Sequence, residues 1–176
     1  MKEGIFFTLR SVLIFLALVI FFELLFSVLL IPAFENRTGG EALLDMSFGF
    51  SPEQAYEMVS NYGVEGRRYY HTIQLVDLAF PVSYTLLLVS LIGYLAKRRN
   101  RDRLLAWPVP RWIFLPLLAS GCDLLENAGI FAMLRIYPDP FPVVARMTSL
   151  FGVLKFSAIT ASIGLVLALL VSRHRQ

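Results

Sequence analysis

The chain has 176 residues, of which 57% are hydrophobic and only 16% are charged, and its mean hydropathy is +0.65. A soluble domain normally carries about a quarter charged residues, and here the apolar residues form long runs, which excludes an ordinary soluble fold. The net charge of +3 comes without a nucleic-acid-binding motif, so we expect no nucleic-acid partner. A single cysteine, Cys122, excludes an intrachain disulfide and a cysteine-based zinc site.

The apolar runs predict an all-α fold, a bundle of four transmembrane helices within one membrane domain, 1–176. We expect the spans at about 11–31, 72–96, 112–137 and 144–171. The first run ends at Pro32 and is longer than the roughly 7–15 residues of a signal-peptide core. It also contains Glu23, so we expect it to be retained, with cleavage as the alternative.

Basic residues set the predicted topology. Ten of them fall on one side of the membrane if the chain starts inside: Lys2, Arg10, Lys97, Arg98, Arg99, Arg101, Arg103, Arg111, Arg173 and Arg175. The other side then holds five arginines (Arg37, Arg67, Arg68, Arg135 and Arg146) and seven acidic residues. The positive-inside rule therefore predicts a multi-pass protein of the plasma membrane with both termini and loop 97–111 in the cytoplasm. Membrane lipids, including anionic headgroups at this loop, are the expected partners.

The connection 33–71 is expected outside. Within it, Ser51 and Gln54 form a capping-box pattern around Pro52, and Gly63 is placed to end the short helix in the left-handed conformation. Leu43, Leu44, Met46, Phe48 and Phe50 are too apolar for a free loop. We interpret 33–71 as a cap over the outer mouth of the bundle, with a helix resting on the lipid headgroups as the alternative.

Five ionisable residues lie inside the predicted spans: Glu23, Asp77, Asp123, Glu126 and Lys155. A charge at mid-bilayer costs about 2.5–3.5 kcal/mol on insertion scales, so such residues face the bundle interior. At about 1.5 Å rise per residue, all five fall between the midplane and the outer third of the membrane. Neighbouring polar residues extend each into a stripe, including Gln74 and Tyr84 with Asp77, and Asn127 with Asp123. Four stripes at one depth predict one polar pocket, open outward under the cap.

Two interpretations of this pocket stay open. In the first, Lys155 pairs with Asp123 or Asp77 and the other polar groups are hydrogen-bonding glue between helices. In the second, four acids facing one lysine leave a carboxylate that takes up a proton or binds a cationic ligand. Asp123 and Glu126, one turn apart, are then the residues expected to share a proton. We also expect Pro81 to kink the second span beside Asp77, and Pro116 to act similarly below Asp123.

Known catalytic signatures are absent from the sequence. The two histidines, His71 and His174, lie at opposite ends of the predicted topology and cannot form paired haem ligands, and Lys155 beside the carboxylates argues against a metal site. We expect no cofactor. The candidates for general acid–base chemistry are Asp77, Asp123 and Glu126, with Lys155 as an electrophilic helper.

The chain resembles small bacterial and archaeal four-span membrane proteins of uncharacterised function in the runs FGFSPEQAYEMVSNYGVEGRRYY, LVDLAFPVSY and CDLLENAGI. The shared patterns are D-x-x-x-P-x-x-Y, from Asp77 to Tyr84, and D-x-x-E-N, from Asp123 to Asn127. The layout is more distantly similar to the EXPERA group of sterol isomerases and sigma-2-receptor-like proteins. That similarity implies an acidic intramembrane pocket for sterols or cationic amphiphiles, with Glu23 and Asp77 as its acids. The sterol isomerases use a pocket histidine, for which His71 is the available residue.

The leading hypothesis is an acidic intramembrane pocket that binds or modifies a lipid-like or cationic amphiphilic small molecule. Its expected ligand-binding residues are Glu23, Gln74, Asp77, Tyr84, Asp123, Glu126, Asn127 and Lys155. The alternatives are a non-catalytic interaction or assembly protein, in which the polar residues are structural, and a small proton-coupled carrier, for which a homodimer is the candidate assembly.

Overall fold

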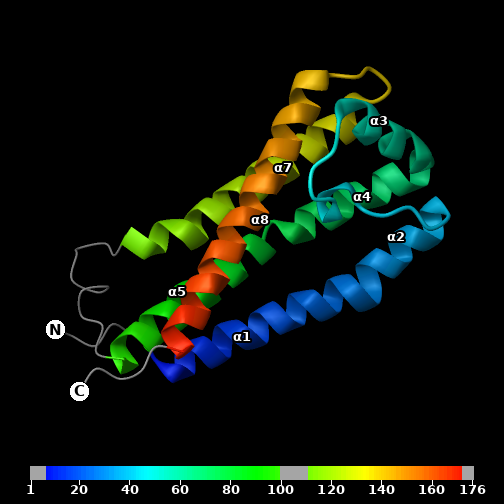
Figure 1. Cartoon of the computed structure of the whole chain (residues 1–176). Coiled ribbons are helices and arrows are strands. Elements are labelled where there is room, and N and C mark those ends of the chain that lie inside the picture. Colours follow the sequence, from blue (N-terminus) through cyan, green and yellow to red (C-terminus); the bar gives the residue numbers. More distant parts are fainter. Residues whose placement is uncertain (1–6, 100–110, 172–176) are drawn as a thin grey trace.

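The computed structural model of the chain describes residues 7–99 and 111–171. Within these ranges the chain is helical and has no strand, which confirms the predicted all-α fold class (Figure 1). Four helical runs are long and apolar enough to cross a membrane: Leu9–Thr38, Gly63–Arg98, Arg111–Ile136 and Pro142–Val171. The chain is thus a multi-pass integral membrane protein. Six of the residues discussed above lie outside the described ranges: Lys2, Arg101, Arg103, Arg173, His174 and Arg175.

The first span is longer than predicted. It comprises α1 (Leu9–Leu24), a π-helical turn η1 (Leu25–Leu30) and α2 (Ile31–Thr38), and it ends at Gly39 with φ 73°. The helix therefore continues beyond Pro32, where the span was predicted to end. Proline is tolerated in the first turn of a helical segment, and Pro32 occupies that place in α2, directly after a turn in which the Ile31 amide already bonds back to Phe26 O.

The second span also differs from its predicted bounds. It consists of α4 (Gly63–Asp77) and α5 (Phe80–Arg98), so it begins nine residues before the expected position 72. Gly63 has φ 61°, the left-handed conformation predicted for it, but the chain resumes a helix at once instead of continuing as a loop. The interruption at 78–79 lies between Asp77 and Pro81, where the kink was expected.

The third and fourth spans are α7 (Phe114–Ile136), preceded by a 3₁₀ turn η3 (Arg111–Ile113), and α8 (Pro142–Val171). The expected kink at Pro116 is not present, because α7 runs unbroken and Pro116 lies in its first turn, where proline costs little. The Pro116 carbonyl instead accepts a hydrogen bond from Thr85 Oγ1 at 3.2 Å. This contact joins α5 to α7.

The helices form a tight pair with an outer layer beside it. The α7–α8 pair has the most extensive interface, and α5 packs on both of its helices. The first span (α1, η1 and α2) forms the outer layer and lies along the second span. Its helix α1 packs mainly on α5, and α2 packs on α4 (Figure 1). The polar cavity described below lies between this outer layer and the α7–α8 pair.

Residues 39–62 form a cap that packs over one end of the bundle. We call this end of the bundle the cap end and the other end of the bundle the opposite end. This cap contains a 3₁₀ turn η2 (Leu44–Met46) and α3 (Pro52–Asn61). The predicted capping box is present, with Gln54 N donating to Ser51 Oγ and Ser51 N donating to Gln54 Oε1. The cap is fastened to the bundle by buried Leu44 and Val59, and by a 2.8 Å hydrogen bond from Phe50 N to Ser149 Oγ of α8.

Candidate functional site

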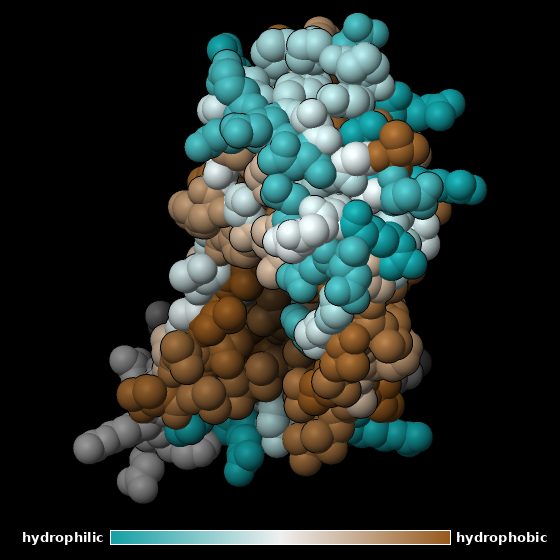
Figure 2. Space-filling model, turned by 90° about the vertical axis from the view of Figure 1, so that its right-hand side faces the viewer, coloured by the Kyte–Doolittle hydropathy of each residue, from teal (hydrophilic) through white to brown (hydrophobic). Residues whose placement is uncertain are grey.

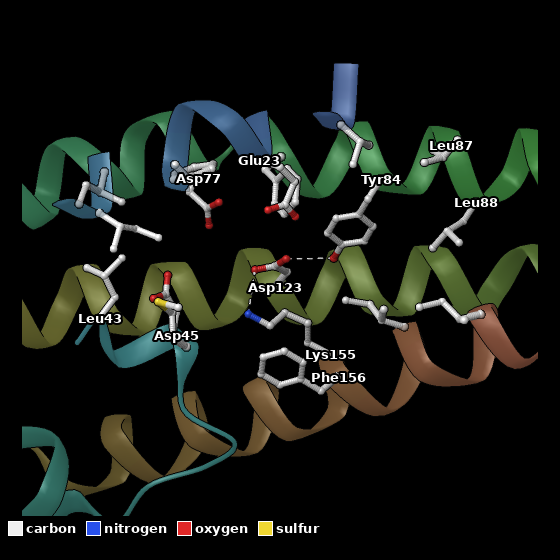
Figure 3. Close-up of a pocket in the computed structure, with 18 residues that line it drawn as sticks. Glu23, Leu43, Asp45, Asp77, Tyr84, Leu87, Leu88, Asp123, Lys155 and Phe156 are labelled. Carbon is white, nitrogen blue, oxygen red and sulfur yellow. Dashed lines mark hydrogen bonds and ion pairs between the residues drawn. The ribbon is translucent and has the colours of Figure 1, made fainter. Parts of the chain in front are cut away.

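A cavity of about 500 Å³ lies between the outer layer, the cap and helices α4, α5, α7 and α8. Its wall is mostly hydrophobic. Six polar side chains interrupt it: Glu23, Asp45, Asp77, Tyr84, Asp123 and Lys155 (Figure 3). Each of the four spans and the cap contributes at least one of them. A single cavity therefore collects polar groups from every span, as the stripes predict.

Asp77 and Asp123 are held by neutral hydrogen-bond donors from neighbouring helices. Asp77 is the last residue of α4, where the span is interrupted, and its Oδ2 accepts from Asn127 Nδ2 of α7 at 2.6 Å. Asp123 Oδ2 accepts from the Tyr84 hydroxyl of α5 at 3.0 Å. Both carboxyls are buried, so each contact links two spans while it holds a carboxyl at the cavity wall.

Lys155 bridges two carboxyls of α7. Its Nζ lies 2.5 Å from Glu126 Oε2 and 3.5 Å from Asp123 Oδ1, and 4.9 Å from the centre of the Phe156 ring. Glu126 is fully buried behind Lys155, close to Gly152, and is not part of the cavity wall. The two carboxyls expected to share a proton therefore share a cation.

Asp45 is a wall residue that the sequence analysis missed. It lies in η2 of the cap, where its Oδ1 accepts from the Tyr70 hydroxyl at 3.0 Å and its Oδ2 accepts from Gln74 Nε2 at 3.3 Å. Burial raises the pKa of the Asp45 carboxyl, against the opposing effects of Lys155 and the Tyr70 hydrogen bond. One signal was available: Asp45 is an acid within an apolar segment, between Leu44 and Met46, that was itself judged too apolar for a free loop.

Glu23 differs from the other acids of the wall. Glu23 lies on α1 and is exposed, and its carboxylate makes no hydrogen bond or ion pair within the described part of the chain. Figure 3 shows that Glu23, Asp77 and Asp123 point into the same space. The wall thus combines carboxyls that have partners with one that has none.

The predicted ligand-binding residues divide into two layers. Glu23, Asp77, Tyr84, Asp123 and Lys155 line the cavity. Gln74, Asn127 and Glu126 are buried one layer behind, where they contact Asp45, Asp77 and Lys155 respectively. Four acceptor oxygens of this second layer are buried and have no hydrogen-bond partner among the described residues: Gln74 Oε1, Asn127 Oδ1 and both Glu126 oxygens, of which Oε2 is ion-paired with Lys155. The second layer orients the wall rather than forming it.

Several other candidates are not brought to the cavity. His71 packs its ring edge-on against Phe131, with centroids 4.6 Å apart, and does not line the wall. Arg135 and Arg146, two of the five arginines on the predicted outer side, are exposed and do not line it either. Within residues 7–99 and 111–171, no three His, Cys, Asp or Glu side chains are grouped to hold a metal ion.

The cavity opens sideways between α1 and α8. The wall residues that are largely exposed mark this mouth: Glu23 on α1, Met46 on the cap (59% exposed) and Ile163 on α8 (47% exposed). Figure 2 shows a hollow in the hydrophobic surface below the more hydrophilic cap end. The mouth therefore lies on the side of the helical bundle, whereas the sequence analysis expected an opening outward under the cap.

No protein-family model, curated protein or solved structure matches this chain. The resemblances described above therefore stay predictions.

Proposed function

We propose that this integral membrane protein binds a lipid-like or cationic amphiphilic small molecule in the cavity. The observation that carries the proposal is the imbalance of charge in an otherwise apolar wall. Four carboxyl side chains line it (Glu23, Asp45, Asp77 and Asp123), whereas the cationic side chain in it is Lys155. That lysine is shared between Glu126 at 2.5 Å and Asp123 at 3.5 Å, so Glu23, Asp45 and Asp77 face the cavity without an ion pair among the described residues.

The two parts of the wall favour the two parts of an amphiphile. Carboxyl groups in apolar surroundings are stabilised by a nearby cation, which compensates for lost hydration. Hydrophobic side chains such as Phe80, Leu88 and Ile159 form most of the remaining wall and favour a hydrocarbon chain or ring system. A molecule with a positive head and an apolar body satisfies both.

A modifying enzyme is the catalytic version of this proposal. Of the four candidate acid–base residues, Asp77, Asp123 and Lys155 are in contact with the cavity. Glu126 does not line the cavity and pairs with Lys155, so its role in such chemistry would be to position that lysine. Binding needs only the charges and shape of the wall and is the function that the geometry supports best.

A structural role for the polar residues is the second candidate function. It is favoured by the way these residues connect different spans: Asp77 with Asn127 joins α4 to α7, Tyr84 with Asp123 joins α5 to α7, and Lys155 joins α8 to α7. Such contacts hold membrane helices together at about 0.6 kcal/mol each. On this alternative the protein is an assembly or interaction partner and the cavity contains only bulk lipid.

Asp77→Asn separates the two functions, because asparagine retains an acceptor oxygen for Asn127 but removes the charge. Wild type and variant are purified in a mild detergent, and the bound small molecules are identified by native mass spectrometry and lipid analysis. We expect a discrete cationic amphiphile that is retained by wild type and lost from the variant. Glu57→Gln, an exposed acid of α3, is the matched control and should retain it. Only bulk lipid, unchanged in Asp77→Asn, contradicts the proposal and favours the structural role.

We further propose a plasma-membrane location with both termini in the cytoplasm. The support is the cluster Lys97, Arg98, Arg99 and Arg111 at the opposite end. In a Cys122→Ala background, Glu57→Cys should react with a membrane-impermeant maleimide in intact cells. Lys97→Cys should react only after the cells are permeabilised. The reverse pattern contradicts this orientation.

A further inference from the structure

One group of hydrophobic wall residues continues from the carboxyls toward the opposite end of the bundle, and the other hydrophobic wall residues lie at the cap end: Phe26, Ile31, Leu43, Met46 and Ile73. We call Glu23, Asp45, Asp77 and Asp123 the carboxyl layer, and Val19, Leu87, Leu88, Ile159 and Ile163 the apolar lane. Along α1 the chain passes Val19 before Glu23 as it runs toward the cap. Along α5 and α8, which run away from the cap, the lane residues follow Tyr84 and Lys155. The three helices therefore place the apolar lane on the same side of the carboxyl layer, toward the opposite end, as Figure 3 shows for Leu87 and Leu88.

The lane is long enough for an extended alkyl chain. Ile163 follows Lys155 by eight residues of continuous helix, which corresponds to roughly 12 Å along the axis at 1.5 Å per residue. Its far end is at the mouth, since Ile163 is 47% exposed. A chain lying in the lane can therefore continue into the surrounding hydrocarbon, and the cavity volume does not limit its length.

The carboxyl layer contains a polar group without a partner, and that group is a hydrogen-bond acceptor. The Glu23 carboxylate lies in the wall and has no partner among the described residues, and a carboxylate accepts hydrogen bonds but donates none. What the carboxyl layer lacks is therefore a hydrogen-bond donor as well as a positive charge, and an ammonium group with N–H bonds supplies both.

The polarity of the wall matches one leaflet of the bilayer. A lipid in the leaflet nearer the cap has its head toward the cap end and its chain toward the midplane. The carboxyl layer and the apolar lane have the same order, and the mouth between α1 and α8 faces lipid at this level. A molecule from that leaflet can enter sideways without turning over.

We propose that the ligand is a long-chain amine with at least one N–H on its ammonium head. The head lies in the carboxyl layer and the chain lies along the apolar lane, after sideways access from the leaflet nearer the cap. This inference depends on the proposed function and specifies its ligand class and orientation.

Photocrosslinking of the full chain in lipid nanodiscs tests the orientation. The probe is dodecylamine with a diazirine at the end of its alkyl chain, and the adducts are mapped by peptide mass spectrometry. We expect saturable adducts within 85–98 of α5 and 156–171 of α8, beyond the carboxyl layer. Unlabelled dodecylamine should compete roughly tenfold or more better than dodecyltrimethylammonium, which has the same chain and charge but no N–H.

Matched variants separate this inference from the proposed function. Asp77→Asn should abolish the saturable adducts. Ile163→Trp, which fills the lane, should reduce them severalfold. Leu167→Trp, one turn further on and exposed outside the wall, should leave them unchanged.

Each contrary outcome identifies what fails. Saturable adducts on residues 43–50 of the cap overturn the orientation and leave the binding function standing. Equal competition by the trimethylammonium compound overturns the need for N–H. The absence of any saturable adduct, in wild type and in Asp77→Asn alike, overturns the proposed function and this inference with it.

Discussion

The α7–α8 interface and helix α1 each contain a glutamate within a membrane span, in opposite environments. Glu126 is fully buried at the interface, lies close to Gly152 and pairs with Lys155 at 2.5 Å. Glu23 is exposed on α1 and contacts no polar partner in the part of the chain that the structure describes. In the most apolar 18-residue stretch of the first span no residue is buried, whereas 44% of the residues are buried in the corresponding stretch of the third span.

This difference separates two uses of a carboxyl group in a membrane. A carboxyl that is enclosed with its own lysine contributes to folding, because the pair compensates for the cost of dehydrating both charges. A carboxyl on a helix that packs mainly on one neighbour contributes little to the fold, and it remains available to a ligand. Asp77 and Asp123 lie between these extremes, since each faces the cavity but is also hydrogen-bonded across helices.

The largest expected effect comes from breaking the enclosed pair. Lys155→Met leaves Glu126 buried without its cation and should lower the free energy of unfolding by about 3–5 kcal/mol, measured by denaturation in bicelles. The double variant Lys155→Met with Glu126→Leu should recover much of this loss, because it removes the orphaned charge as well. Leu154→Met, at the neighbouring position, is the control and should change the stability by less than about 0.5 kcal/mol. Equal stability of Lys155→Met and wild type contradicts the structural role of the pair.

A smaller loss is expected from separating α7 and α8. A Cβ atom added at Gly129 would overlap Thr148 Oγ1 and lie 3.0 Å from Thr148 Cβ, and that hydroxyl is fixed by a 2.8 Å hydrogen bond to Val144 O. Gly129→Ala should therefore cost about 1–3 kcal/mol through overpacking. Gly121→Ala, on the same helix with no neighbouring atom within 4 Å, should be neutral or slightly stabilising. Equal changes in stability for the two variants would contradict a special role for the close contact between Gly129 and Thr148.

The cap provides a pH-dependent comparison. Burial raises the pKa of Asp45 in the folded protein above its ordinary 3.8, so the folded state binds the proton more tightly than the unfolded state. Between the ordinary pKa and the raised folded pKa, stability should therefore fall as pH rises. In ligand-free protein, Asp45→Asn should raise the unfolding midpoint at neutral pH and have little effect at pH values below the ordinary pKa. Asp139→Asn, an exposed acid outside the cap, is the control; identical pH profiles for Asp45→Asn and wild type contradict this prediction.

The smallest effect on stability is expected at the exposed carboxyl. Glu23→Gln should change the free energy of unfolding by less than about 0.5 kcal/mol, because the side chain has no partner to lose. The same variant should weaken retention of the long-chain amine probe, since it removes charge from the carboxyl layer. A stability loss comparable to that of Lys155→Met would instead place Glu23 among the structural carboxyls.

Much of the architecture follows from sequence pattern alone. The four spans, the capping box of α3 and the left-handed Gly63 depend on local properties: apolar runs, hydrogen bonding over three residues and the freedom of glycine. The inward-facing polar stripes follow from the cost of leaving such residues in hydrocarbon. The helices of the first two spans extend beyond the predicted span bounds, because a π-helical turn admits Pro32 and because the segment from Gly63 to His71 is polar yet helical.

The site itself was only partly predictable. Helical periodicity finds a residue on an inward face, but it does not distinguish a wall residue from one behind the wall. Glu126 and Asn127 share the inward face of α7 with Asp123, and only Asp123 reaches the cavity. Asp45 was missed because periodicity within spans cannot place a cap residue against α4 by long-range hydrogen bonds to Tyr70 and Gln74.

The sequence by itself determined that this chain crosses the membrane four times and turns its carboxyls inward, because hydrophobicity and the cost of buried charge act on each helix separately. The tertiary structure decided which carboxyls are paired, which one is free and where the cavity opens. Those outcomes depend on how closely helices approach one another: the small residues of α7 and α8 allow a tight contact that encloses Glu126, whereas α1 packs mainly on α5 and leaves a mouth beside Glu23.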